Sequence, residues 1–335
     1  MNIAINGFGR IGRAVFKNLL DKPGIKIVAI NDLTETKNLA YLLKYDSVYG
    51  IYDKSVSYTK NSLTVKGKKI PVIAEPEPAK LPWRKFKVDL VVESTGRFCK
   101  KEQAVAHLKA GAKKVAISAP AKSDDIKTIV PGVNEKSLTK SDKIFSMASC
   151  TTNCLSTVTD IIRQKIGIVN ALMTTIHGYT SSQGIVDSPH KDPRRGRAAA
   201  INIVPTTTGA AIATTKAIPQ LKGKFDGLAV RVPVVVGSLC DTVYLTKKKV
   251  TVDKVNKLLA SYSKKTRYKG ILAVTNEPLV STDIIKNSAS AIVDLSMTRV
   301  VGDNLLKIIS WYDNEWAYSC RMADLCAYIN KRKLF

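Results

Sequence analysis

The first twelve residues restrict the fold of this chain more than any other segment. Residues 2–6 alternate as a short strand, and Gly7, Gly9 and Gly12 follow in a G-x-G-x-x-G spacing that leads into a helical pattern over residues 13–20. The first glycine permits a tight turn, the second lets the backbone approach a pyrophosphate, and the third allows the helix to pack closely on the strand. The pattern predicts a parallel α/β sheet with a dinucleotide at the helix N-terminus.

An acidic residue in the right place strengthens this prediction. A second strand is expected over residues 25–30, and Asp32 follows it, about 20 residues beyond the glycines, where a ribose 2′-hydroxyl is bound in such folds. The same carboxylate would repel the 2′-phosphate of NADP, so NAD is the predicted cofactor. Without this context, the three glycines would fit an ordinary strand turn almost as well.

The remaining pattern predicts two domains. Strands over 89–93 and 114–118, separated by a helix over 102–110, continue the parallel sheet, and Thr95 and Ser118 lie at or just after strand ends, where ligands of such sheets bind. Longer strand-like runs and a terminal helix follow, at 169–176, 227–236, 242–246, 291–294, 305–312 and 317–329. The expected fold class is α/β: a Rossmann-type dinucleotide-binding domain (1–149) plus a mixed α+β catalytic domain (150–315). The C-terminal residues 316–335 are expected to pack back on the first domain.

A cysteine near the middle of the chain is the candidate nucleophile. Cys150 opens a helix-like stretch, residues 155–166, and a helix N-terminus favours a thiolate and can hold an oxyanion. The alternative is a buried structural cysteine. Among three histidines, His177 ends a strand and is the best base for Cys150, although strand-end histidines are often structural. His107, in a helical pattern, is expected at the surface, and His190 lies in a basic loop.

Composition limits the class of protein. The 335 residues carry a formal net charge of +26, but their basic clusters at 247–249, 264–267 and 331–333 are scattered, which favours solvated surface; weak secondary binding of nucleic acid is the alternative. The six cysteines lack zinc-type spacing and are expected to be reduced thiols, with no metal site. Without an apolar run of about 20 residues or a signal peptide, a cytoplasmic protein with no membrane association is expected.

Blocks along nearly the whole chain resemble the glyceraldehyde-3-phosphate dehydrogenase family. The resembling blocks are residues 5–13, 148–154, 177–180, 206–211, 229–233 and 311–316. The resemblance implies that Cys150 attacks the aldehyde of glyceraldehyde 3-phosphate, that NAD takes the hydride, and that inorganic phosphate cleaves the thioester to give 1,3-bisphosphoglycerate. His177 would move the protons, and a homotetramer is expected. The close alternative within this resemblance is an erythrose-4-phosphate dehydrogenase.

The resemblance also implies binding residues. The cofactor contacts are Gly7, Gly9, Arg10, Ile11, Gly12, Asp32, Thr95, Ser118 and Asn314. Thr180 and Arg231 match the contacts to the substrate phosphate. The contacts to the attacking phosphate are Ser149, Thr151, Arg197, Thr208 and Gly209. Arg197 and Arg231 could each contact both phosphates. Ser188 stands where NAD-specific members often have leucine, which weighs against a strict preference for NAD.

Overall fold

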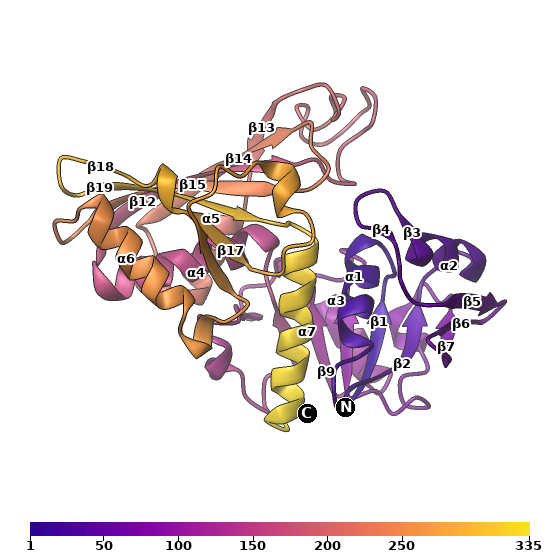
Figure 1. Cartoon of the computed structure of the whole chain (residues 1–335). Helices are drawn as coiled ribbons and strands as arrows, with labels where there is room; N and C mark the ends of the chain where they lie inside the picture. The colour runs from indigo at the N-terminus through magenta and orange to yellow at the C-terminus, as the bar shows by residue number, and fades with distance from the viewer. The chain divides into compact units, whose positions relative to one another are not determined.

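The computed structural model describes residues 1–335 and divides them into two compact units. Unit 1 comprises Met1–Ile129, Glu135–Ala148 and Ser319–Phe335, and unit 2 comprises Val130–Asn134 and Ser149–Tyr318. In Figure 1 the N-terminal residues of unit 1 are indigo and purple, whereas unit 2 runs from magenta to orange and yellow. The chain passes from unit 1 to unit 2 between Ala148 and Ser149.

Unit 1 is built on a nine-stranded sheet with the order β10-β11-β9-β8-β1-β2-β7-β6-β5. The strands are β1 (Asn2–Asn6), β2 (Lys26–Asn31), β5 (Val56–Thr59), β6 (Ser62–Val65), β7 (Lys68–Ile73), β8 (Leu90–Glu93), β9 (Lys114–Ile117), β10 (Lys127–Thr128) and β11 (Ile144–Ser146). A small hairpin of β3 (Tyr45–Asp46) and β4 (Gly50–Ile51) stands apart from it. The pairs from β10 to β7 are parallel, and only β5 and β6 add antiparallel ribbons.

The helices of unit 1 are α1 (Arg10–Leu19), α2 (Thr36–Lys44) and α3 (Lys101–Lys109). Strands β8 and β9 are buried along their whole length, as parallel strands covered on both faces must be. The strand order reverses at β1, which pairs with β2 on one side and β8 on the other. The carboxyl end of β1 is therefore the switch point of the sheet, where ligands bind in open α/β folds.

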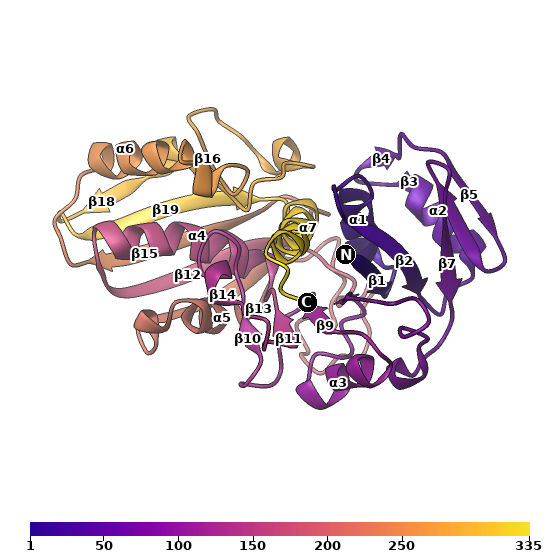
Figure 2. The same cartoon turned by 90° about the horizontal axis from the view of Figure 1, so that it is seen from below.

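Unit 2 carries a mixed eight-stranded sheet with the order β13-β14-β12-β15-β19-β17-β16, and β18 pairs with β19. The strands are β12 (Ile168–Gly178), β13 (Val204–Thr207), β14 (Phe225–Val232), β15 (Ser238–Thr246), β16 (Leu272–Thr275), β17 (Ala291–Asp294), β18 (Arg299–Val301) and β19 (Leu305–Tyr312). Helices α4 (Cys150–Lys165), α5 (Ala210–Ala217) and α6 (Val252–Ser263) share one apolar core with this sheet (Figure 2). Along β15, buried and partly exposed residues alternate, as expected for a sheet with one covered face.

The C-terminal helix α7 (Trp316–Lys331) begins in unit 2, and its residues from Ser319 onward belong to unit 1. Lys22 forms an ion pair with Asp324 at 2.8 Å, and the Cys320 thiol lies 3.2 Å from Asn18 Oδ1, so two contacts fasten the helix near α1. No helix is both long enough and apolar enough to cross a membrane.

Three expectations differ from the structure in detail. The helix expected from residue 155 begins at Cys150, and the strand expected to reach residue 236 ends at Val232. His107 is fully buried and not at the surface, because Trp83 and Glu93 supply partners for both ring nitrogens inside the unit.

Candidate active site

A cavity of about 340 Å³ opens at the carboxyl ends of the central strands of unit 1. Its lining residues are Asn6, Gly7, Gly9, Asn31, Asp32, Leu33, Thr34, Glu75, Pro76, Ser94, Thr95, Arg97 and Phe98. These residues follow or end β1, β2, β7 and β8, so the cavity lies at the switch point of the sheet. The predicted residues Gly7, Gly9, Asp32 and Thr95 are all among them.

The three glycines serve different physical needs. Gly7 has φ +90°, and a Cβ there would lie 2.7 Å from the Thr95 nitrogen. A Cβ on Gly12 would lie 2.1 Å from the Gly7 carbonyl oxygen, so this residue must be glycine for α1 to pack on the turn. A Cβ on Gly9 would meet nothing within 4 Å, which leaves the start of α1 open to a ligand. Gly7 therefore lies in the tight turn, Gly12 at the contact of α1 with that turn, and Gly9 at the open start of the helix.

The carboxylate of Asp32 is held in place by two backbone donors. Oδ2 accepts a hydrogen bond from Phe8 N at 2.7 Å, and Oδ1 accepts one from Thr34 N at 2.9 Å. Each oxygen keeps a further lone pair for a hydroxyl donor in the cavity. This is the arrangement that a ribose 2′-hydroxyl requires.

Other predicted cofactor residues lie in different settings. Arg10, the first residue of α1 and the neighbour of Ile11, makes two hydrogen bonds of 3.2 Å to Asp46. The Ser118 hydroxyl, one residue beyond β9, is buried without a hydrogen-bond partner, as a group that awaits a ligand would be. In unit 2, Asn314 Oδ1 accepts from Gly237 N and the Ser238 hydroxyl, which identifies the other amide atom as the donor Nδ2.

The predicted nucleophile and base meet inside unit 2. Cys150 is the first residue of α4, whose N-cap Ser149 accepts a hydrogen bond from Thr152 N at 3.0 Å. His177 lies near the end of β12, and its Nε2 is 3.5 Å from Cys150 Sγ. The strand end and the helix start therefore bring the two side chains into contact, although 27 residues separate them.

The two partners of His177 Nδ1 favour different tautomers, because the Gly178 carbonyl can only accept and Arg231 Nη1 can only donate. Nδ1 lies 2.7 Å from the Gly178 carbonyl, which also accepts a hydrogen bond from Arg231 Nη1 at 3.0 Å. If Nδ1 donates its proton to this carbonyl, Nε2 keeps a lone pair directed at the Cys150 thiol. Arg231 also lies against Nδ1, because it is the register partner of His177 in the parallel pair of β12 and β14.

Burial dominates the titration of this pair when each charge forms alone. It raises the pKa of the Cys150 thiol to about 11, against the guanidinium of Arg231 and the Thr151 hydrogen bond, which lower it. Burial, and then the charge of Arg231, lower the pKa of His177 to about 3. Proton transfer from Sγ to Nε2 instead forms both charges together at the helix N-terminus, where their mutual attraction and the helix dipole offset part of the burial cost.

The buried side chain of Tyr312 contacts the elements that carry Cys150 and His177, and the sequence did not predict this role. The Tyr312 hydroxyl is hydrogen-bonded to Thr151 at 2.8 Å and to Thr175 at 2.9 Å. Its ring packs edge-on against His177, with 6.0 Å between ring centroids. Tyr312 thus links the helix that carries Cys150 to the strand that carries His177. The sequence placed Tyr312 only inside the block 311–316, with no signal for this role.

The other residues predicted to bind the two phosphates lie on the loop after β12, before α5 and on β14. Thr180 follows β12, and its hydroxyl pairs with Ser182 at 2.8 Å. Thr208 and Gly209 precede α5, with the Thr208 hydroxyl accepting from Ala210 N. Arg231 Nε is buried without a partner, which fits an arginine built to receive an anion.

Arg195 and Arg197, two positions apart in one loop, lie in different settings. Arg197 pairs with Asp187 at 2.9 Å, and its side chain is 63% exposed. Arg195 donates to the Thr206 hydroxyl and the Thr207 carbonyl, and its charge contributes to the lowered pKa of Arg231, after burial. The run Arg194-Arg195-Gly196-Arg197 offers no spacing signal that distinguishes these arginines.

A dinucleotide-type fold joined to a domain with a contacting cysteine and histidine defines the class of cysteine-dependent dehydrogenases. Residues 1–101 match the family model "Glyceraldehyde 3-phosphate dehydrogenase, NAD binding domain", and residues 149–314 match the model of the C-terminal domain. The chain belongs to the glyceraldehyde-3-phosphate dehydrogenase family.

Relatives with that name match over nearly the whole length. A glyceraldehyde-3-phosphate dehydrogenase of Geobacillus stearothermophilus is 52% identical over 335 residues, covering 100% of this chain and 99% of the relative. Those of Borreliella burgdorferi and Thermotoga maritima are 50% and 52% identical, covering 99% and 96% of this chain and 100% and 97% of the relatives.

Proposed function

We propose that this chain catalyses the NAD-dependent, phosphorylating oxidation of glyceraldehyde 3-phosphate to 1,3-bisphosphoglycerate. The contact between Cys150 Sγ and His177 Nε2, with Arg231 beside it, is the observation that carries this proposal. Unit 1 would hold the cofactor and unit 2 the reacting groups. The names of the relatives support the same substrate.

Several features of unit 1 fit NAD. The open space at Gly9 suits a pyrophosphate at the start of α1, and the oriented carboxylate of Asp32 suits a ribose at the end of β2. The unpartnered hydroxyl of Ser118 is a further group that can bind the cofactor. Asn314 Nδ2 would serve the carboxamide of the nicotinamide. When bound, NAD accepts the hydride that the oxidation releases.

The residues of unit 2 then divide the remaining work. Cys150 Sγ forms a bond to the aldehyde carbon as its proton passes to His177 Nε2, and His177 returns this proton to the oxygen of the thiohemiacetal. The backbone N–H groups at the start of α4 stabilise the developing oxyanion. Loss of hydride from carbon, with loss of the hydroxyl proton to His177, leaves a thioester on Cys150.

Two anions must bind near Cys150. Arg231 and Thr180 would bind the phosphate of the substrate, and Ser149, Thr151, Thr208 and Gly209 would bind inorganic phosphate. A phosphate oxygen attacks the thioester carbon, the C–S bond breaks, and the thiolate of Cys150 leaves. We assign Arg195 to this region ahead of Arg197, because Arg195 influences Arg231 while Arg197 is paired with Asp187.

Association into a homotetramer is part of this proposal. The sheet of unit 2 has exposed apolar residues on the face away from its helices, Leu172 at 66% and Leu228 at 47%, and the segment before β13 exposes Ile201 at 80% and Ile203 at 71%. Apolar side chains gathered on a strand face are typical of subunit contacts. Sedimentation velocity would test the mass. A cytoplasmic location stays a prediction.

The test of the reaction is its requirement for phosphate. NADH formation from glyceraldehyde 3-phosphate should need added phosphate or arsenate, and rapid turnover without either would exclude the phosphorylating reaction. A comparison of kcat/KM for glyceraldehyde 3-phosphate and erythrose 4-phosphate decides between the two sugars. A higher value for the four-carbon sugar would reverse the substrate assignment.

A further inference from the structure

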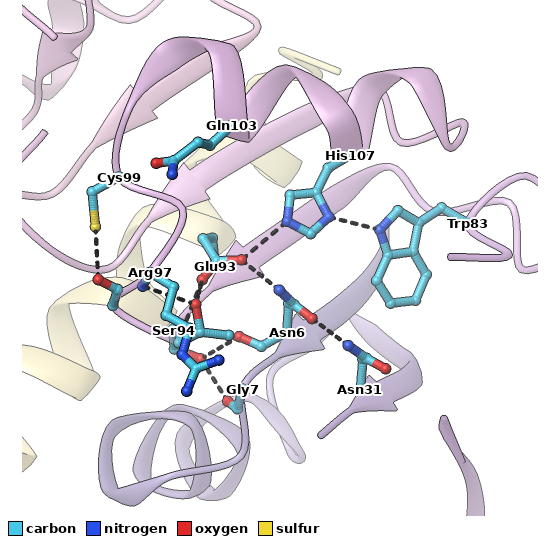
Figure 3. A network of polar contacts seen from close by, with 12 residues as sticks. Asn6, Gly7, Asn31, Trp83, Glu93, Ser94, Arg97, Cys99, Gln103 and His107 are labelled. Atoms are coloured by element: carbon cyan, nitrogen blue, oxygen red, sulfur yellow. Dashed lines mark hydrogen bonds and ion pairs between the residues drawn. The ribbon is translucent and has the colours of Figure 1, made fainter. Parts of the chain in front are cut away.

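Behind the cofactor cavity, buried polar side chains converge on one carboxylate (Figure 3). Glu93 is the last residue of β8 and is 1% exposed. Its Oε2 accepts hydrogen bonds from Asn6 Nδ2 at 2.6 Å and from His107 Nε2 at 3.0 Å. Its Oε1 accepts from both the backbone nitrogen, at 2.9 Å, and the hydroxyl of Thr95. Four donors therefore meet one buried acceptor.

The direction of the bonds on one side is fixed by a tryptophan. Indole Nε1–H of Trp83 can only donate, and it lies 3.0 Å from His107 Nδ1. Nδ1 must then accept, so the ring proton of the neutral imidazole sits on Nε2 and is donated to Glu93. Both nitrogens of His107 are thus engaged within unit 1.

The direction on the other side is fixed by a backbone amide. Glu75 N–H donates to Asn31 Oδ1 at 3.0 Å, so the amide of Asn31 presents Nδ2 to Asn6 Oδ1 at 2.7 Å. Asn6 is in turn left with Nδ2 directed at Glu93. Asn6, Asn31 and Glu75 all line the cofactor cavity, whereas Glu93 lies behind it. The carboxylate of Glu93 is therefore the acceptor at the end of this chain of hydrogen bonds, and it holds the Asn6 amide in place.

Thr95 is where this network reaches the ligand. Its hydroxyl donates to Glu93 Oε1 and accepts from Arg97 N at 3.1 Å, so only a lone pair remains for a group in the cavity. The Thr95 backbone also packs against Gly7, whose Cβ would lie 2.7 Å from the Thr95 nitrogen. The position of Thr95 is therefore coupled to the glycine turn.

We propose that Glu93, held by His107 and Trp83, is a positioning residue for the cofactor. By accepting the hydroxyl proton of Thr95, it makes Thr95 a hydrogen-bond acceptor toward a hydroxyl donor of the dinucleotide. This inference rests on the proposed binding of NAD by unit 1. Glu93, His107 and Trp83 do not line the cavity and take no part in the reaction at Cys150, whereas Thr95, through which Glu93 acts, does line the cavity.

Replacement of Glu93 by glutamine tests the proposal. The E93Q side chain has nearly the same shape as that of Glu93. One of its two acceptor oxygens, however, becomes an NH2 group, which would face a hydrogen-bond donor. We expect the Kd for NAD, measured by titration of the full-length protein, to rise about tenfold or more. At saturating NAD, kcat and the KM for glyceraldehyde 3-phosphate should stay within twofold. A loss of general structure would instead change all three values. The control is Glu102→Gln on the exposed side of α3.

A double-mutant cycle with Thr95→Val tests the route of the effect. If Glu93 acts through Thr95, the Kd of the double variant should be close to that of the weaker-binding single variant. If the fold-increase in Kd of the double variant equals the product of the two single fold-increases, the proposal is overturned.

If E93Q does not fold, Trp83→Phe removes the donor to His107 together with part of a buried ring. It should raise the Kd for NAD about threefold, with kcat unchanged; an unchanged Kd would contradict the proposal. Wild-type protein that fails to bind NAD would refute the proposed function itself. Wild-type binding together with an E93Q Kd within twofold would refute only the role of Glu93.

Discussion

Two buried histidines, one in each unit, are used in opposite ways. His107 in unit 1 has both ring nitrogens committed, one to the indole of Trp83 and the other to the carboxylate of Glu93. His177 in unit 2 has Nδ1 beside a backbone carbonyl and Nε2 beside the thiol of Cys150. A histidine with two fixed partners cannot exchange its proton without breaking the network around it, whereas one that faces a thiol can.

The surroundings of the two histidines differ in the same sense. Around His107, the donors and acceptors are matched on every side. Around His177, the guanidinium nitrogen Nε of Arg231 is buried without a partner, and burial opposes the charge on both Cys150 and His177. A buried polar group without a hydrogen-bond partner is costly in a folded protein. Such a group therefore indicates the place where a ligand supplies the missing partner.

The largest expected effect is at the nucleophile of unit 2. Cys150→Ser should lower kcat by a factor on the order of 10⁴ or more, because a hydroxyl is far harder to ionise than a thiol. The Kd for NAD of unit 1 should not change. Retained turnover, with iodoacetamide labelling at Cys99, Cys154 or Cys240 in place of Cys150, would refute the assignment.

Removal of the base should affect both rate and titration. His177→Asn should lower kcat by roughly 10² to 10⁴. It also removes the group that takes the proton of the thiol, and burial, which raises the pKa of Cys150, then acts without that acceptor. The midpoint of the iodoacetamide profile should therefore move to higher pH, and below it the rate should fall about tenfold per pH unit. We expect the wild-type midpoint below about 8.5. Equal midpoints would show that His177 does not share the proton.

The next effect concerns the anion site. Arg231→Gln should lower kcat/KM for glyceraldehyde 3-phosphate by roughly 30- to 160-fold, as expected for loss of a charged hydrogen-bond pair of about 2 to 3 kcal/mol. It should also raise the midpoint of alkylation, since the guanidinium lowers the pKa of the Cys150 thiol. Arg197→Gln is the matched control on an exposed side chain. A larger loss in the control would restore Arg197 to the site.

The smallest effect is expected in unit 1, at the ribose. The wild-type enzyme should prefer NAD over NADP at least tenfold in kcat/KM, about 1.4 kcal/mol, because Asp32 faces the 2′-phosphate. Asp32→Asn should reduce this ratio, mainly through weaker use of NAD. Equal use of both cofactors by the wild type would show that Ser188 and nearby lysines offset the repulsion.

The sheet strands were largely predictable because their apolar residues repeat at a fixed spacing. Residues 2–6, 291–294 and 305–312 were placed correctly to the residue. The start of α4 was not, since Thr151, Thr152 and Asn153 are polar and yet buried. Apolar periodicity cannot reveal a helix turn whose buried side chains are hydrogen-bonded instead of apolar.

The site was predictable where residue type decides the chemistry and unpredictable where distant partners do. Cys150 and His177 follow from reactivity and position, and their contact agrees with the prediction. The burial of His107 depends on Trp83, 24 positions away in sequence. The distinction between Arg195 and Arg197 depends on which side chain Asp187 attracts. Such choices are made by tertiary contacts, which a single sequence does not contain.

Helix α4 carries the nucleophile on an element buried over nearly its full length. Ser156 donates to Thr214 of α5 and Thr159 is bonded to Tyr244 of β15, so two neighbouring elements hold the helix, while Thr157 donates within the helix to the Asn153 carbonyl. Its amides from Asn153 onward should exchange with deuterium only when unit 2 unfolds as a whole. Inactivation by heat and loss of the folded state would then follow the same time course.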